Sequence, residues 1–144
     1  MGTRSTIAVQ HANGTISQIY CHWDGYLSYN GKILQEHYNS LERAEALVAI
    51  GDLSSLAPSC DCPEGHSFNT PAEGYCVAYG RDRGEDGTAP NMFESLSDYR
   101  SNFQDEEYNY LFRNGEWEVV SYATDNEWVG LSEALEREAA AEAE

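Results

Sequence analysis

Two segments of the chain predict β-hairpins, because in each an Asn-Gly pair separates two runs of apolar residues. The first is centred on Asn13-Gly14 within residues 6–23, and the second on Asn114-Gly115 within residues 108–122. Asn-Gly is the preferred pair for a two-residue type I′ turn, since both turn positions need a positive φ angle. The second turn then pairs Arg113 with Glu116, Phe112 with Trp117 and Tyr110 with Val119, which makes one face apolar: Tyr108, Tyr110, Phe112, Trp117 and Val119.

Helical spacing of apolar residues predicts two helices between the hairpins. The first contains Ile33, Leu34, His37 and Tyr38. The second has Ser40 as its N-cap, ends at Ile50 and is followed by Gly51 as a C′ residue. The apolar side of this second helix is predicted to consist of Leu41, Ala44, Leu47 and Val48.

The remaining segments predict loops, one short strand and a terminal helix. Residues 24–31 and 52–74 are rich in turn-forming residues and predict irregular loops. Residues 75–79 predict a strand, followed by a charged turn at residues 81–86. This order predicts an α+β fold with a single domain over residues 1–130, an antiparallel sheet of the two hairpins plus a central strand, and helices on one face. Residues 131–144 are predicted to form an acidic C-terminal helix or tail.

The composition favours a folded domain. Of 144 residues, 41% are hydrophobic and 12% aromatic, which is enough for a core and argues against a disordered acidic polypeptide. The apolar runs are too short to span a bilayer, and the start of the sequence carries no apolar signal core. We therefore expect a cytoplasmic protein, with no membrane contact and no cofactor.

The charge of the chain is strongly negative and uneven. The formal net charge is −17, and residues 84–144 hold sixteen acidic residues against three basic ones. Such a field repels nucleic acid and anionic membranes and attracts basic surfaces. We therefore expect a protein partner with a basic surface and no direct binding to nucleic acid. The alternative is that the charge only maintains solubility.

The densest cluster of candidate chemistry is residues 20–26. His22 and Asp24 are two positions apart at a strand end and could form an acid/base pair. The alternative is structural, with the aromatic residues packing and Gly25 forming a turn. The sequence lacks phosphate-loop, Rossmann, nucleophile-elbow and HExxH patterns, so it gives no support for an enzyme.

Residues 60–76 offer the ligand types that zinc prefers, namely Cys60, Cys62, His66 and Cys76. The Cys-x-Cys spacing is tighter than the usual zinc knuckle, so unpaired thiols are the alternative.

Two arginines in an acidic chain could bind an anion such as a nucleotide. The second hypothesis for function is therefore a small-ligand or metal-binding module, whose pocket would consist of His22, Asp24, Tyr26, Arg81 and Arg83. The alternative for the arginines is a solvated turn whose charges satisfy one another.

Carboxylates in the last third of the chain are the predicted partner-binding residues. Alternate residues on one face of a strand lie about 7 Å apart, which resembles the spacing of phosphates along a nucleic-acid strand. The predicted set is Glu85, Asp86, Asp105, Glu106, Glu107, Glu116, Glu118, Asp125 and Glu127.

Several segments together are similar to a family of small acidic proteins encoded by phages, prophages and plasmids: residues 2–7, 19–26, 31–34, 37–38, 51–56 and 79–85. The resemblance implies an accessory protein that binds and inhibits host defence machinery. Anti-CRISPR and anti-restriction proteins that imitate the charge of nucleic acid belong to this class. The resemblance implies no catalytic residue.

Overall fold

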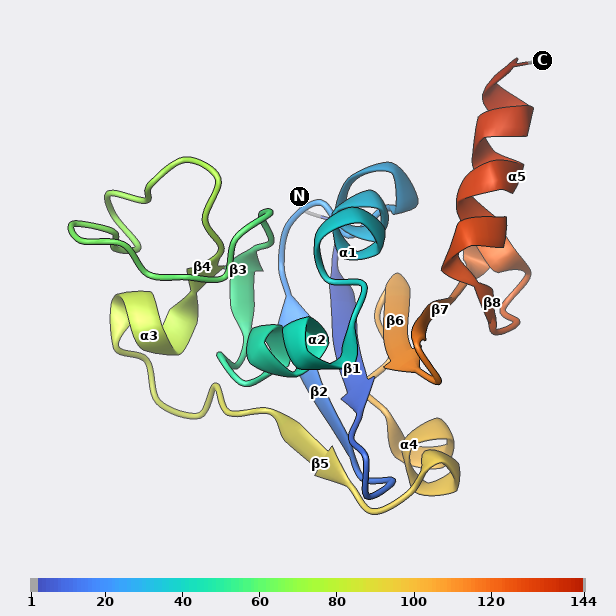
Figure 1. Cartoon of the computed structure of the whole chain (residues 1–144), viewed down its shortest axis with the longest axis horizontal. Coiled ribbons are helices and arrows are strands. Elements are labelled where there is room, and N and C mark those ends of the chain that lie inside the picture. The colour runs from blue at the N-terminus through green and yellow to red at the C-terminus, as the bar shows by residue number, and fades with distance from the viewer. Residues whose placement is uncertain (1–2, 144) are drawn as a thin grey trace.

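The computed structural model describes residues 3–143, which form one mixed β-sheet with helices against it (Figure 1). The strands are β1 Ser5–Gln10, β2 Ile16–Cys21, β3 Leu53–Ser55, β4 Val77–Ala78, β5 Asn91–Phe93, β6 Tyr108–Arg113, β7 Glu116–Ser121 and β8 Val129–Gly130. The helices are α1 Lys32–His37, α2 Leu41–Val48, α3 Tyr79–Arg83, α4 Leu96–Asn102 and α5 Leu131–Ala143, with a π-helical turn η1 at Leu27–Gly31 and a 3₁₀ turn η2 at Tyr122–Thr124.

The α+β class is confirmed, but the prediction of a purely antiparallel sheet is wrong. The strand order is β4-β3-β2-β1-β6-β7-β8, with β5 also paired to β2. Within each hairpin the strands are antiparallel, whereas β1 lies parallel to β6 and β2 parallel to β3. The two hairpins join through their first strands, with Ile7 opposite Tyr110. A parallel pair needs a long crossover connection, and the chain between β1 and β6 supplies it.

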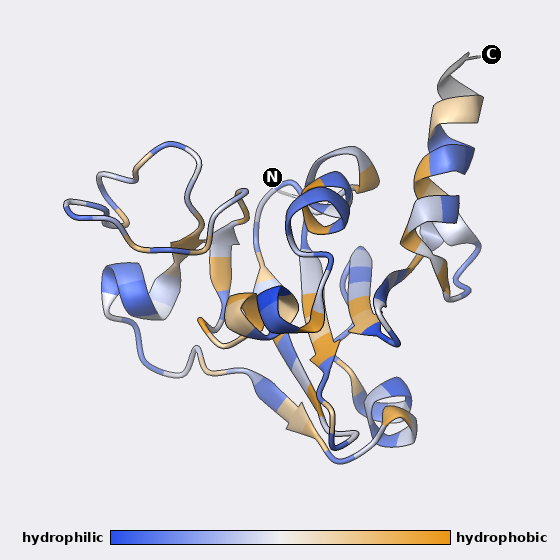
Figure 2. Cartoon of the chain, in the orientation of Figure 1, coloured by the Kyte–Doolittle hydropathy of each residue, from blue (hydrophilic) through white to orange (hydrophobic). Residues whose placement is uncertain are grey.

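Both faces of the sheet are covered, so the prediction of helices on one face is also wrong. The larger core packs Ile7, Ile19 and Tyr110 against α1, α2 and the start of α5. A second cluster on the opposite face joins Leu111 to Tyr99 of α4. Figure 2 shows hydrophobic residues concentrated in the central strands and α2, while α3 is hydrophilic.

The second predicted turn is confirmed and the first is wrong in its type. Asn114 and Gly115 have φ angles of 54° and 79°, and the register of β6 and β7 is the predicted one. In the first hairpin only Gly14 has a positive φ angle, 91°. His11 and Thr15 close a loop of residues 12–14 through a 2.8 Å hydrogen bond, which is the type I turn with a glycine bulge.

The predicted helices at α1 and α2 are confirmed. Ser40 Oγ accepts a hydrogen bond of 3.2 Å from the Arg43 N–H, and Gly51 follows α2 with a φ angle of 92°. Leu41 was predicted to be in the core and is exposed at the surface. Three local predictions are wrong: β3 and η1 occupy predicted loops, and α3 starts at Tyr79, where strand and turn were expected. Each is a short element stabilised by distant contacts.

The acidic C-terminal helix is present as α5. Its first turn belongs to the core, since Leu131 and Ala134 are buried in the larger cluster. The rest of the helix projects away from the sheet (Figure 1). Among residues 3–143, no helix combines the length and the apolar character needed to cross a bilayer.

Candidate functional site

The segment from Tyr20 to Tyr26 builds the turn between β2 and η1. The buried Asn30 donates a hydrogen bond of 3.2 Å from Nδ2 to the Trp23 carbonyl, and its N–H donates to the Asp24 carbonyl at 3.1 Å. Asp24 has a φ angle of 57°, so it provides the left-handed residue of the turn. The His22 ring lies with Nδ1 2.7 Å from the Tyr20 hydroxyl and packs edge-on against Trp23. These contacts give the segment a structural role.

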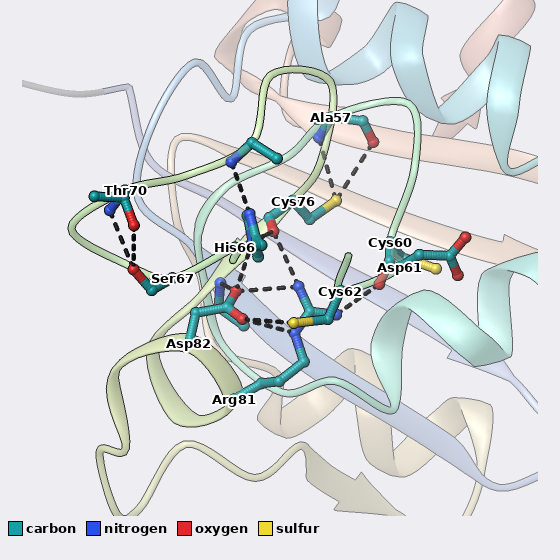
Figure 3. Close-up of polar contacts among 12 residues, drawn as sticks. Ala57, Cys60, Asp61, Cys62, His66, Ser67, Thr70, Cys76, Arg81 and Asp82 are labelled. Carbon is teal, nitrogen blue, oxygen red and sulfur yellow. Dashed lines mark hydrogen bonds and ion pairs between the residues drawn. The ribbon is translucent and has the colours of Figure 1, made fainter. Parts of the chain in front are cut away.

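The long loop of residues 57–74 is anchored by a cluster around Asp82, shown in Figure 3. The Asp82 and His66 side chains have no exposed surface. Asp82 accepts hydrogen bonds from Arg81 Nε at 2.9 Å and from the Ala78 N–H at 2.8 Å. Burial alone would raise the pKa of Asp82, but the hydrogen bonds from Arg81 and Ala78 outweigh it and hold this pKa below its usual range.

The same cluster occupies the residues considered for zinc. His66 Nδ1 accepts a hydrogen bond of 2.9 Å from the Ala72 N–H, while Nε2 donates to the Cys76 carbonyl at 3.0 Å. The buried Cys76 thiol lies 3.2 Å from the Ala57 nitrogen, which donates to it. Among the side chains that the structure describes, no three from His, Cys, Asp or Glu are arranged to hold a metal ion. Two of the four candidate ligands, His66 and Cys76, are therefore engaged by main-chain groups.

The arginines of the small-ligand hypothesis are engaged by other groups of the protein. Arg81 donates to the Cys60 carbonyl at 2.6 Å as well as to Asp82. The Arg83 guanidinium lies 4.7 Å from the ring centre of Phe68 and pairs with Glu85 at 3.9 Å. The structure thus uses both arginines to support the 57–74 loop.

A chain of contacts that the sequence did not reveal links His11, Glu45 and Ser17. Nδ1 of His11 lies 2.5 Å from a Glu45 carboxylate oxygen, and Nε2 lies 2.7 Å from the Ser17 hydroxyl. These groups resemble a nucleophile, a base and an orienting acid. Ser17, however, is only 6% exposed, and its hydroxyl donates to the sulfur of Met92. The arrangement ties the first hairpin loop to α2 and β5.

The strongest candidate for a binding site is a groove of about 360 Å³ at the β7 side of the sheet. We call it the acidic groove. Three consecutive acidic residues and three aromatic residues contribute to its lining. Its lining residues are Phe103, Asp105, Glu106, Glu107, Asn109, Val120, Ser121, Tyr122, Asn126 and Trp128.

The acidic wall of this groove is held in place by two buried amide side chains. Gln18 on β2 exchanges two hydrogen bonds with the main chain of Gln104, at 3.0 and 3.1 Å. Asn109 on β6 donates to a carboxylate oxygen of Asp105 at 2.9 Å and accepts from the Glu106 N–H at 3.0 Å. The carboxylates therefore project from a fixed main chain, which reduces the entropy lost when a partner binds.

The opposite wall is a braced loop after β7. The buried Thr124 hydroxyl accepts from the Ser121 N–H at 3.0 Å and donates to the Glu127 carbonyl at 2.7 Å. Asp125 and Asn126 both have left-handed φ angles, 55° and 60°. Such a conformation costs non-glycine residues on the order of 1 kcal/mol each, so it persists only where surrounding contacts enforce it.

Aromatic rings form the base of the groove and one exposed edge. The Trp128 ring packs against Phe103 and Tyr99, with ring centres 6.0 Å apart in both pairs. Arg100 lies 5.9 Å from the Trp128 ring centre. Tyr122 is 69% exposed, an unusual position for a large aromatic side chain.

The predicted partner-binding carboxylates divide between two edges of the sheet. Asp105, Glu106 and Glu107 lie in the groove, and Asp125 and Glu127 belong to its braced loop. On β7, Glu118 is ion-paired with Arg100 at 3.6 Å and Arg113 at 3.1 Å, while Glu116 is exposed near the turn. Glu85 and Asp86 follow α3, on the side of the sheet away from β8 (Figure 1).

The sequence indicates the carboxylates of the last third of the chain without indicating a groove. Phe103, Tyr122 and Trp128 were not singled out, because only the fold places the residues before β6 beside those after β7. Comparisons with protein-family models, curated proteins and solved structures found no match to this chain. Function is therefore inferred from the charges and geometry of the chain itself.

Proposed function

We propose that this protein is a phage-type accessory protein that binds and inhibits a nucleic-acid-handling defence protein of the host. The target is of the CRISPR-effector or restriction-nuclease kind, and the inhibitor acts in the host cytoplasm as a mimic of nucleic-acid charge. The observation that supports this most is the acidic groove, where Asp105, Glu106 and Glu107 are presented together by a fixed loop.

Electrostatics favours such a target. A chain with a net charge of −17 is attracted to basic surfaces, and nucleic-acid channels are the basic surfaces of defence nucleases. The rigid groove adds shape and aromatic contact area to this attraction, which charge alone does not supply. The proposal therefore predicts a specific complex whose association slows steeply as salt rises.

The test is a DNA-protection assay with purified CRISPR effectors and restriction nucleases, at low and high salt. The informative variant combines Asp105→Asn, Glu106→Gln and Glu107→Gln, which keeps hydrogen-bond acceptors and removes three charges. The matched control combines Asp61→Asn, Glu64→Gln and Glu73→Gln, which removes the same charges from the exposed 57–74 loop.

We expect the native chain and the control to protect DNA from at least one nuclease, and the groove variant to need at least about tenfold more protein, as lost charge-assisted contacts imply. Equal loss of DNA protection in both variants would show that only the net charge of the protein matters. Absence of protection across the panel would remove the proposal.

A further inference from the structure

We propose that the acidic groove receives an arginine side chain from the partner protein, with the guanidinium between the carboxylates and the aromatic rings. This inference rests on the proposed function for the presence of a basic partner, but it concerns a chemistry that can be tested without that partner. It assigns the groove one occupant, an arginine-bearing segment of a protein.

The carboxylates retain capacity for such a ligand. Asp105 uses one oxygen for the hydrogen bond from Asn109, and Glu106 uses one for a 3.0 Å hydrogen bond from the Gln104 side chain. A carboxylate offers about four acceptor positions, so these internal bonds leave most positions available. A guanidinium has five donors in a planar fork, which suits several carboxylate oxygens at once.

The aromatic side of the groove suits the flat guanidinium. Tyr122 is 69% exposed, with its ring centre 5.7 Å from that of Tyr108, and Trp128 is half-buried; both line the groove. The protein already places one of its own arginines near Trp128, since Arg100 lies 5.9 Å from that ring centre. An aromatic face attracts a cation through its quadrupole, and arginine adds stacking that the compact lysine ammonium lacks.

Other occupants fit the same groove less well. A phosphate or nucleic-acid strand would meet three carboxylates of its own sign. A purely apolar segment would cover those carboxylates without pairing them, and burying an unpaired charge is costly. Charge complementarity therefore selects a cation with an apolar or planar body.

The experiment is an NMR titration of the full chain with a short capped peptide containing one arginine, compared with the same peptide containing citrulline. Citrulline keeps the planar shape and loses the charge. The three tryptophan indole signals provide internal references: Trp128 lines the groove, Trp23 is exposed on another segment and Trp117 is buried. We expect the arginine peptide to shift Trp128 selectively, with a Kd at least about tenfold lower than that of citrulline.

Two single variants separate the aromatic contribution from net charge. Tyr122→Ala keeps every charge and should weaken arginine-peptide binding severalfold, whereas Tyr122→Phe keeps the ring and should bind like the native chain. The groove triple variant should abolish the Trp128 shift and the 57–74 loop triple variant should keep it.

Equal binding of the two peptides, or shifts confined to Trp23, would overturn this inference. The outcomes also distinguish it from the proposed function. DNA protection that depends on Asp105, Glu106 and Glu107 without any arginine-peptide binding would leave the function standing and remove the arginine site. Selective peptide binding without DNA protection would leave the arginine site standing and remove the proposed function.

Discussion

The side-chain amide of Gln18 forms two hydrogen bonds with the main chain of Gln104, which lies 86 positions later in the sequence. The amide acts like a short piece of neighbouring strand, because it donates to a carbonyl and accepts from an N–H. Gln18 is 1% exposed, so neither bond competes with water. The orientation of the acidic wall of the groove therefore depends on a residue of β2, in the other hairpin.

Replacing Gln18 with leucine should destabilise the protein and loosen this wall. The Gln104 main chain would lose both partners, at a cost of about 1–3 kcal/mol in the free energy of unfolding. Chemical denaturation measures the stability, and hydrogen exchange of the Gln104 amide measures the local effect. Gln104→Ala is the control, because it leaves both main-chain bonds in place; an equal loss in that variant would contradict the explanation.

Gly25→Ala should be strongly destabilising, since an added Cβ would lie 2.7 Å from Ser5 Cβ and 2.9 Å from the Thr3 carbonyl oxygen. Relieving such overlap shifts backbone and costs about 1–3 kcal/mol or more. The matched variant is Gly130→Ala, where an added Cβ meets nothing within 4 Å. Thermal unfolding of the two variants should therefore differ clearly, and similar Tm values would show that the segment before η1 adapts.

Two buried tyrosines should respond in opposite ways to loss of the hydroxyl. Among the described residues, the Tyr99 hydroxyl has no hydrogen-bond partner, so Tyr99→Phe should raise the free energy of unfolding by about 1 kcal/mol. The Tyr110 hydroxyl donates to the Gly25 carbonyl at 2.6 Å, so Tyr110→Phe should lower it by a similar amount. Urea denaturation of both variants checks the difference, and a loss in Tyr99→Phe would reveal an unrecognised partner.

The Asp82 cluster should make stability fall in acid. Because the folded-state pKa of Asp82 is lowered, its contribution is present above its unfolded pKa of about 3.9 and is lost as the pH falls through the folded-state pKa. Asp82→Asn should therefore be less stable at neutral pH and lose less stability below about pH 4. Denaturation midpoints measured from pH 7 to pH 2 test this.

Asp52 provides a control of the opposite sign. Burial raises the pKa of Asp52 above its usual value, although the Tyr20 N–H donates to it. The folded state therefore binds that proton more tightly than the unfolded chain, and this contribution declines as the pH rises. Asp52→Asn should therefore raise the free energy of unfolding at neutral pH. As the pH falls, the stabilities of Asp52→Asn and Asp82→Asn relative to the native chain should change in opposite directions. A change in the same direction would contradict both assignments.

The cysteines should react with a thiol reagent in order of exposure. Cys62 is exposed and Cys60 half-buried, whereas burial raises the pKa of Cys21 to about 12 and also raises that of Cys76. The thiolate is the reactive form, so Cys21 and Cys76 should react only on unfolding. Ellman's reagent with and without denaturant measures this, and Cys62→Ser should remove the fastest phase; rapid native labelling of Cys76 would disprove its anchoring role.

Local features were predictable where a few neighbouring residues carry the whole signal. The Asn114-Gly115 turn fixed the register of β6 and β7, because both turn residues adopt the positive φ angles of a two-residue turn. Ser40 likewise began α2 through its own hydroxyl. The same rule mispredicted the first hairpin, since a three-residue loop with a type I turn and a bulge at Gly14 also accommodates an Asn-Gly pair, at its last two positions.

The candidate site was predictable in charge but not in shape. Asp105, Glu106 and Glu107 belong to the carboxylates predicted to imitate the spacing of phosphates, and all three line the groove. Arg81 and Arg83 were considered for an anion, yet their partners Cys60 and Phe68 lie in a loop with no regular pattern. Contacts of that kind have no periodicity from which they could be inferred.

The sequence by itself determined the α+β class, the second hairpin and the strong negative charge, because period, turn chemistry and composition act over short distances. Only the tertiary structure decided that β1 lies parallel to β6 and that α4 covers the second face. Both features depend on how the apolar surfaces of the two hairpins pack once they are brought together. The same packing placed residues 103–107 beside residues 120–128 and so created the acidic groove.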